Sequence, residues 1–154
     1  MATGTPIAET QAAIEALLKS RVPAGVIVRG LTGADFEEET ALLVVTPPAA
    51  LVMFRDEGLD SKEAYGLIYD STQGFSVIAG AVNLRGDNEE RIGALELLNR
   101  VCDALAGARL GLAGTTQKPL VVLRRVYLGQ FDAEGTWYVL EAEVVSVAQF
   151  SGNA

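Results

Sequence analysis

The densest group of side chains that could do chemistry is an acidic cluster formed by Asp56, Glu57, Asp60 and Glu63. Paired carboxylates can exchange protons with a substrate or hold a hard cation such as Ca²⁺. The spacing does not match a calcium-binding loop, and no apolar flank is present to raise a carboxyl pKa. The sequence therefore predicts a long, exposed and solvated loop over residues 55–65.

Histidine is absent from the chain, which removes the usual general base and the commonest zinc ligand. A Ser-His-Asp or Cys-His site is therefore impossible. The single cysteine, Cys102, lies in the apolar stripe of a predicted helix, where a thiol behaves as a small hydrophobe. We expect no catalytic residue, no cofactor and no metal site, so the sequence predicts a protein that is not an enzyme.

Two further patterns could bind anions. The glycines between residues 107 and 114 resemble a phosphate-binding loop only loosely, because no Gly-Lys-Ser/Thr ending follows and the loop comes after a helix. The pair Arg124 and Arg125 lies in a predicted strand. We interpret these arginines as cross-strand partners of Glu141 or Glu143, not as an anion site.

The overall charge narrows the class of partner. The 154-residue chain carries 20 acidic and 12 basic residues, a net charge of −8, which argues against specific nucleic-acid binding and against adhesion to anionic membranes. No uninterrupted apolar run reaches the roughly 18 residues of a membrane-spanning helix. The first residues lack the basic and apolar regions of a signal peptide, so we expect a cytoplasmic site of synthesis and one domain over residues 1–154.

Hydrophobic periodicity predicts two helices. Thr5 and Pro6 are typical of a helix start, and this first helix is expected to end near Arg21. A second helix is expected to begin at Asp87 or Asn88 and to stop at Gly107. Its predicted buried stripe consists of Ile92, Leu95, Leu98, Cys102 and Leu105, widened by Leu97 and Val101.

Extended segments fill most of the remainder, and the predicted strands cover residues 26–28, 41–45, 49–54, 67–69 and 74–84. Within the last of these, Gly80 indicates a bulge or a close approach of another group. A C-terminal hairpin is expected, with strands over 119–131 and 136–147. Tyr138 and Leu140 begin one face of its second strand, and Trp137 and Val139 begin the other. The sequence thus predicts an α+β fold, with two helices packed on one face of a mostly antiparallel sheet that ends in a long hairpin.

The order of elements resembles the tail terminator, or minor tail, proteins of long-tailed bacteriophages, particularly those of Mu-like contractile tails. Four segments carry the resemblance, and they are IAETQAAIEALLKSRVP, PAALVMFRDEG, RIGALELLNRVCDALAG and KPLVVLRRVYLGQFDAEGTWYVLEAEVV. In that family a similar G-A-x-x-L-L helix ends in L-A-G and is followed by a loop and a P-L-x-x-x-R strand. The family has no catalytic signature to transfer.

The resemblance implies a structural virion protein that forms a ring, commonly a hexamer, at the junction of tail and neck. Such a ring caps the finished tail tube, stops its growth and offers its other face to head-side neck proteins, with the sheath as a further possible partner. A strongly acidic ring would also repel DNA from its channel wall. Candidate interface residues are Phe131, Trp137, Arg124, Arg125, Asp56, Glu57 and Asp60.

Three alternatives stay open on the sequence alone. The chain could be a tail-completion or head–tail connector protein, a cytoplasmic α+β binding module without catalysis, or an enzyme that uses carboxylates or a bound metal. For the hairpin, Phe131 and Trp137 lie near the predicted turn, where large aromatic side chains are common interface anchors. Packing of these rings within their own chain is the competing interpretation.

Overall fold

The computed structural model describes residues 7–31, 47–61, 68–82, 92–110, 119–130 and 135–149. Its elements are the helices α1 (Ile7–Arg21) and α4 (Ala94–Leu105) and the strands β1 (Ile27–Leu31), β2 (Ala49–Ser61), β3 (Ile68–Ala81), β4 (Val121–Gln130) and β5 (Thr136–Gln149). The predicted strand over 41–45 and the predicted helix start at Asp87 or Asn88 lie outside the described residues.

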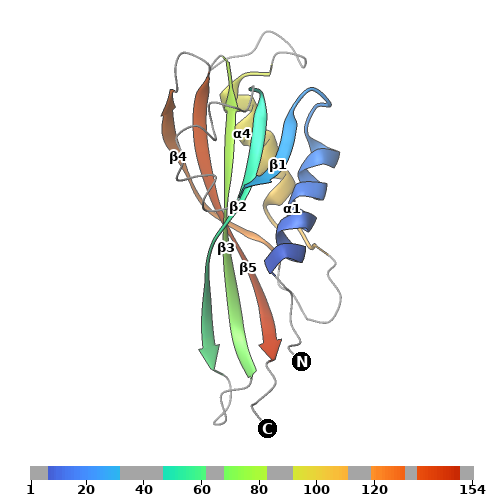
Figure 1. Cartoon of the computed structure of the whole chain (residues 1–154), viewed down its shortest axis with the longest axis vertical. Helices are drawn as coiled ribbons and strands as arrows, with labels where there is room; N and C mark the ends of the chain where they lie inside the picture. Colours follow the sequence, from blue (N-terminus) through green and yellow to red (C-terminus); the bar gives the residue numbers. More distant parts are fainter. Residues whose placement is uncertain are drawn as a thin grey trace.

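The strands form a five-stranded sheet in the order β1-β2-β3-β5-β4. β1 pairs parallel to β2, whereas the pairs β2–β3, β3–β5 and β4–β5 are antiparallel. Both helices lie against one face of this sheet (Figure 1). The predicted α+β fold, with two helices on a mostly antiparallel sheet and a C-terminal hairpin, is therefore confirmed.

The main core lies between the helices and the sheet. From α1, Ile14 and Leu18 are fully buried, and the Gln11 side chain donates a hydrogen bond to the Val52 carbonyl at 3.0 Å. From α4, Leu97 and Val101 are fully buried. Apolar residues at helical spacing lie on one side of a helix, so each helix packs a single apolar stripe against the sheet. The strand residues that meet them are Val28, Ala50, Val52, Phe75, Val77, Ala79, Leu140, Ala142 and Val144.

The second helix differs from its prediction in two respects. It begins at Ala94 because Gly93 adopts an extended conformation (φ −78°, ψ 160°), so the helix starts later than Asp87 or Asn88. Leu95, expected in the buried stripe, is 40% exposed, because the buried face is centred on Leu97, Leu98 and Val101. Cys102 is half-buried and packs against the margin of the main core.

The sheet continues beyond the helices as a narrower, three-stranded extension. The pairing of β1 with β2 ends at Met53, and the pairing of β4 with β5 begins at Glu143. Past these points, the described part of the sheet contains only β2, β3 and β5, which run together toward the lower end of the molecule (Figure 1). We call residues 56–61, 68–74 and 143–149 the leg.

The leg contradicts the prediction of a solvated loop over residues 55–65 as far as Ser61, whereas residues 62–65, with Glu63 of the acidic cluster, lie outside the described residues. Residues 56–61 instead pair with β3, from Asp56 opposite Gly74 to Ser61 opposite Tyr69. A β-bulge between Phe54 and Asp56 shifts the register where the strand leaves the core. Strands are recognised in a sequence by alternating apolar residues. This segment is exposed on one face and polar on the other, so it lacks that alternation and the sequence did not indicate a strand.

Candidate interaction surface

The face of the sheet that the helices leave uncovered, here called the open face, carries its own apolar cluster. Ala49, Leu51, Ile78 and Trp137 are at most 1% exposed and form the cluster, with Met53, Leu128 and Val139 packed around it. The side chains of β5 therefore alternate between two apolar layers, in agreement with the two faces predicted for the second strand of the hairpin. Leu140, Ala142 and Val144 point to the helices, and Trp137 and Val139 point to the open face.

Trp137 packs within its own chain. The indole lies against Gly80, its register partner on β3, and a Cβ atom at position 80 would overlap the ring. The prediction that Gly80 admits a close approach is thereby confirmed. Because Trp137 is 1% exposed, its side chain offers almost no surface to a partner, so the competing interpretation of intramolecular packing describes this residue. Phe131 lies outside the described residues.

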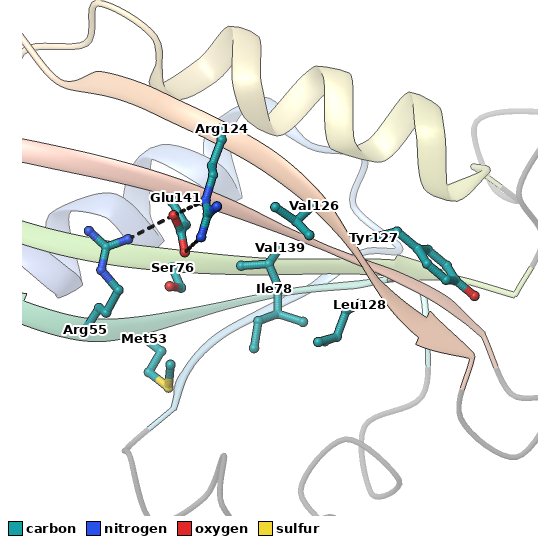
Figure 2. A pocket seen from close by; sticks show the side chains of 10 residues that line it. All are labelled: Met53, Arg55, Ser76, Ile78, Arg124, Val126, Tyr127, Leu128, Val139 and Glu141. Carbon is teal, nitrogen blue, oxygen red and sulfur yellow. Dashed lines mark hydrogen bonds and ion pairs between the residues drawn. The ribbon is translucent and has the colours of Figure 1, made fainter.

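A groove of about 290 Å³ crosses the open face beside this cluster. Its lining combines apolar side chains, among them Val126, Leu128 and Val139, with a cluster of charged ones (Figure 2). Arg124 and Glu141 form two hydrogen bonds, Nε to Oε2 at 2.6 Å and Nη2 to Oε1 at 3.4 Å. The predicted cross-strand pair of Arg124 with Glu141 is confirmed.

Arg55 approaches the same carboxylate from β2, with its Nη1 atom 3.5 Å from Oε2 of Glu141 (Figure 2). Its Nε atom lies 3.5 Å from Oδ1 of Asp56, so this guanidinium lies between two carboxylates. Gly74 leaves room for the guanidinium, because a Cβ atom at position 74 would meet both Arg55 and Asp56. The open face therefore holds its central charges in fixed positions by contacts that join β2, β5 and β4, with the Arg55–Glu141 contact crossing over β3.

The electrostatics of this cluster do not favour acid–base chemistry. The hydrogen bond from Arg124 lowers the pKa of Glu141, partial burial opposes this effect, and the positive charges of Arg124 and Arg55 add to the lowering. The same hydrogen bond raises the pKa of Arg124. A general acid or base works best with a pKa near the ambient pH. Both groups are displaced away from neutrality, so the pair is suited to holding its geometry and charge.

The edge strand β4 exposes unusually many apolar side chains. Val121, Leu123, Val126 and Tyr127 are between 43% and 56% exposed. An edge strand presents unpaired backbone groups, and a long apolar edge is an aggregation hazard unless something covers it. One feature of the sequence indicates this surface, because apolar residues in the segment VVLRRVYL fall on both faces of a strand. The individual exposed positions were not predicted.

The second arginine of β4 is held on the opposite face from the first. Arg125 donates a hydrogen bond from Nη1 to Oδ1 of Asn99 on α4, at 2.7 Å. The predicted pairing of Arg125 with Glu141 or Glu143 is thus wrong, because its register partner is Leu140, whose side chain faces the helices. Tyr127 lies on this face as well and contacts Tyr138, with ring centroids 5.5 Å apart.

The acidic interface candidates lie together on β2 in the leg. Asp56 and Asp60 are exposed, whereas Glu57 is half-buried on the face toward the helices. There Glu57 accepts a hydrogen bond from the hydroxyl of Ser71 at 2.6 Å and one from the amide of Gln73 at 3.4 Å. Glu57 therefore stabilises the pairing of β2 with β3, and the exposed carboxylates are Asp60 and Asp56, of which Asp56 also contacts Arg55.

Within the described ranges, no group of three or more histidine, cysteine, aspartate or glutamate side chains is arranged to hold a metal ion. Neither described helix is long and apolar enough to cross a membrane.

Comparisons with known proteins give little direct guidance. No protein-family model matches the chain, and no curated protein matches it. A solved structure described as "Virion of native gene transfer agent (GTA) particle" contains a chain that is 22% identical, with 77% of this chain and 90% of that chain covered and a TM-score of 0.34. A TM-score of this size does not define a common fold, so the functional inference depends on the surface described above.

Proposed function

We propose that this protein is a structural component of a phage-like virion, a tail terminator that assembles into a ring. In this role the ring caps the tail tube, stops its growth and joins the tail to head-side neck proteins. Its partners are copies of itself, the tube protein and the neck proteins, with the sheath as a further partner in a contractile tail. It is assembled in the bacterial cytoplasm and finally located in the virion.

The observation that carries the proposal is the exposed apolar edge of β4. Val121, Leu123, Val126 and Tyr127 lie on a ten-residue strand, which is long for an edge. Large exposed apolar patches mark interaction sites in soluble proteins. The most prominent charged group beside it, the Arg124–Glu141 pair, is suited to structure and not to proton transfer. These features favour a protein that works by assembly.

The particular assembly comes from the sequence resemblance to tail terminators. That resemblance extends over the first helix, the strand that begins near Pro48, the second helix and the C-terminal hairpin. A ring forms when a patch on one copy meets a different patch on the next and the rotation between copies closes. The net charge of −8 per chain is compatible with a channel through which DNA passes without adhering.

The proposal is tested by measuring the mass of the purified protein over a range of concentrations, together with negative-stain electron microscopy. We expect a closed ring with a central opening and a mass that is a fixed multiple of the 16.2 kDa chain. A protein that stays monomeric at every concentration would contradict the proposed function. A ring that does not bind tube-like particles would favour the related role of a tail-completion or connector protein.

One observation favours a second candidate, a small-ligand or protein-binding module of the cytoplasm. The groove on the open face, at about 290 Å³, is close to the lower limit of roughly 300 Å³ for ligand pockets. A monomer that binds a small molecule there, detected by chemical-shift changes at Met53, Ile78 and Val139, would support this alternative and not the ring.

A further inference from the structure

We propose that a seam between α4 and β4, on the helix side of the sheet, binds a carboxylate-bearing surface of a second copy of this chain. The inference rests on the proposed function, because it specifies how one copy holds the next. The seam consists of Leu95 and Asn99 on α4 and Arg125 and Tyr127 on β4. All four residues are exposed, Leu95 by 40% and Tyr127 by 56%.

The two elements meet along this seam and run in opposite directions. The N–H of Gly107 donates to the carbonyl of Leu120 at 2.9 Å, and the N–H of Leu120 donates to the carbonyl of Ala108 at 2.8 Å. These bonds join the end of α4 to the start of β4. Further along, the Arg125 guanidinium donates to Oδ1 of Asn99 at 2.7 Å. β4 therefore runs back along α4 toward the first turn of that helix.

Leu95 and Tyr127 lie at the same level of the seam, and we call them the apolar pair. Leu95 precedes Asn99 by four residues, so it lies on the same side of α4, about 6 Å closer to the start of the helix. Tyr127 follows Arg125 by two residues, so it lies on the same face of β4, about 6–7 Å further along the strand. Since α4 and β4 are antiparallel, both steps lead in the same direction. The apolar pair therefore adjoins the contact between Arg125 and Asn99.

The Tyr127 ring is held in position by its own chain. It contacts the ring of Tyr138 on the neighbouring strand β5, with centroids 5.5 Å apart and ring planes at 64°. A side chain that is fixed before binding loses little conformational entropy when a partner covers it. Tyrosine and arginine are among the residue types that contribute most to binding at protein interfaces. The seam thus has the composition of an interface centre.

The charge of Arg125 determines what kind of surface can cover the seam. Its neighbour Arg124 is bound to the carboxylate of Glu141, whereas Arg125 is bound to the neutral amide of Asn99. Among the described residues, no carboxylate forms an ion pair with Arg125. A partner that covers the apolar pair also removes water from the adjoining guanidinium, and a desolvated charge is costly unless it is paired. The surface that docks here must therefore bring a carboxylate.

A second copy of the chain meets this requirement. The chain carries 20 acidic and 12 basic residues, so most of its charged side chains are carboxylates. One of them, Glu9, is exposed on α1, which covers β1 and β2 at the opposite side of the sheet from β4 (Figure 1). A symmetric contact between two seams would instead bring two Arg125 guanidiniums together, which is unfavourable. The contact is therefore head-to-tail, the geometry that generates rings.

The first test is a charge series at Arg125, with association measured by sedimentation velocity over a dilution series. Arg125→Lys keeps the charge, Arg125→Gln removes it but leaves an amide that can bond to Asn99, and Arg125→Glu reverses it. Association is expected to weaken in that order, at least about tenfold for Arg125→Glu, because like charges at an interface are strongly unfavourable. Arg29→Glu, the same charge change at an exposed position on the opposite edge strand β1, is the matched control and should assemble like wild type.

Salt distinguishes an ion pair from a purely structural effect of the substitution. All copies repel one another through their net charge of −8, and added salt weakens that repulsion in wild type and Arg125→Gln alike. The ratio of the two association constants removes this common effect. If Arg125 binds a carboxylate, the ratio should exceed one at low salt and fall toward one between about 0.01 M and about 1 M NaCl. Lost packing alone would leave the ratio independent of salt.

The apolar pair is tested separately. Tyr127→Ala is expected to weaken association at least about tenfold, because tyrosines at the centre of an interface carry much of the binding energy. Leu95→Ala is expected to weaken it about threefold while leaving the urea midpoint nearly unchanged, because the side chain is exposed in the single chain. A urea midpoint is recorded for every variant, so weakened assembly with an intact fold is separated from unfolding.

The outcomes separate this inference from the proposed function. Rings that persist in Arg125→Glu and Tyr127→Ala would overturn the docking at the seam and leave the ring proposal standing. A ratio of association constants that does not change with salt would show that no carboxylate binds Arg125, and it would also overturn the docking. Assembly that depends on the seam but yields open chains in place of closed rings would support the docking and contradict the terminator function.

Discussion

The contact between Trp137 and Gly80 yields the sharpest prediction of stability. Trp137 is 1% exposed, so folding removes nearly all of its side-chain surface from water. A tryptophan buries about 200 Å², and at about 25 cal/mol per Å² this corresponds to about 5 kcal/mol as an upper value. Because alanine retains part of the burial, we expect Trp137→Ala to lower the free energy of unfolding by about 3–5 kcal/mol.

Gly80→Ala should have opposite effects in two backgrounds. In the wild type the new methyl group would overlap the indole, and overpacking of this kind costs about 1–3 kcal/mol. In Trp137→Ala the ring is gone and the methyl group partly fills the cavity. Alanine is also favoured over glycine in a strand interior by about 0.5–1 kcal/mol. The same substitution is therefore expected to be neutral or stabilising in that background.

The four proteins are compared by urea titration, followed by far-ultraviolet circular dichroism. Fluorescence is unsuitable because Trp137 is the only tryptophan in the chain. The measured quantity is the interaction energy of the double-mutant cycle, which for residues in contact is about 0.5–3 kcal/mol. If Gly80→Ala destabilises both backgrounds equally, the two residues do not touch, and the assignment of Trp137 to the open-face core is refuted.

Three further predictions concern other parts of the molecule. Leu98→Ala should lower the free energy of unfolding by about 2–5 kcal/mol, because the Leu98 side chain is buried between α4 and the sheet. In the same denaturant titration, Leu95→Ala should lower it by less than about 1 kcal/mol, because Leu95 is 40% exposed. Cys102→Ser should leave assembly intact, and slow labelling of the native thiol is expected from its half-buried position; rapid labelling would contradict this. Glu141 has a lowered pKa, so its contribution to stability is fully present above its ordinary value of 4.5 and is lost as the pH falls through the lower folded value. Urea midpoints measured from pH 7 down to acid should therefore fall more in wild type than in Glu141→Gln, and parallel curves would show that the Arg124 contact does not exist in solution.

The sequence by itself determined the helices, the hairpin and the class of fold. Helical spacing of apolar residues placed α1 and α4, because burial of a stripe is a local property of the pattern. Alternation along β5 assigned Leu140 and Trp137 to opposite faces, since successive side chains of a strand point in opposite directions. The absence of histidine excludes whole classes of catalytic site, because every histidine-dependent triad or dyad requires that side chain.

Only the tertiary structure decided where the polar strand, the open face and the apolar edge strand β4 lie. Residues 56–61 form a strand because β3 is beside them to accept and donate backbone hydrogen bonds, a condition that is not written in the segment DEGLDS. Leu95 is exposed and Trp137 is buried for a similar reason. The burial of each side chain depends on which residue lies next to it in the folded chain, and for the indole of Trp137 that residue is Gly80. Periodicity reports the direction of a side chain from its own backbone, whereas burial is set by what the rest of the chain brings to that side.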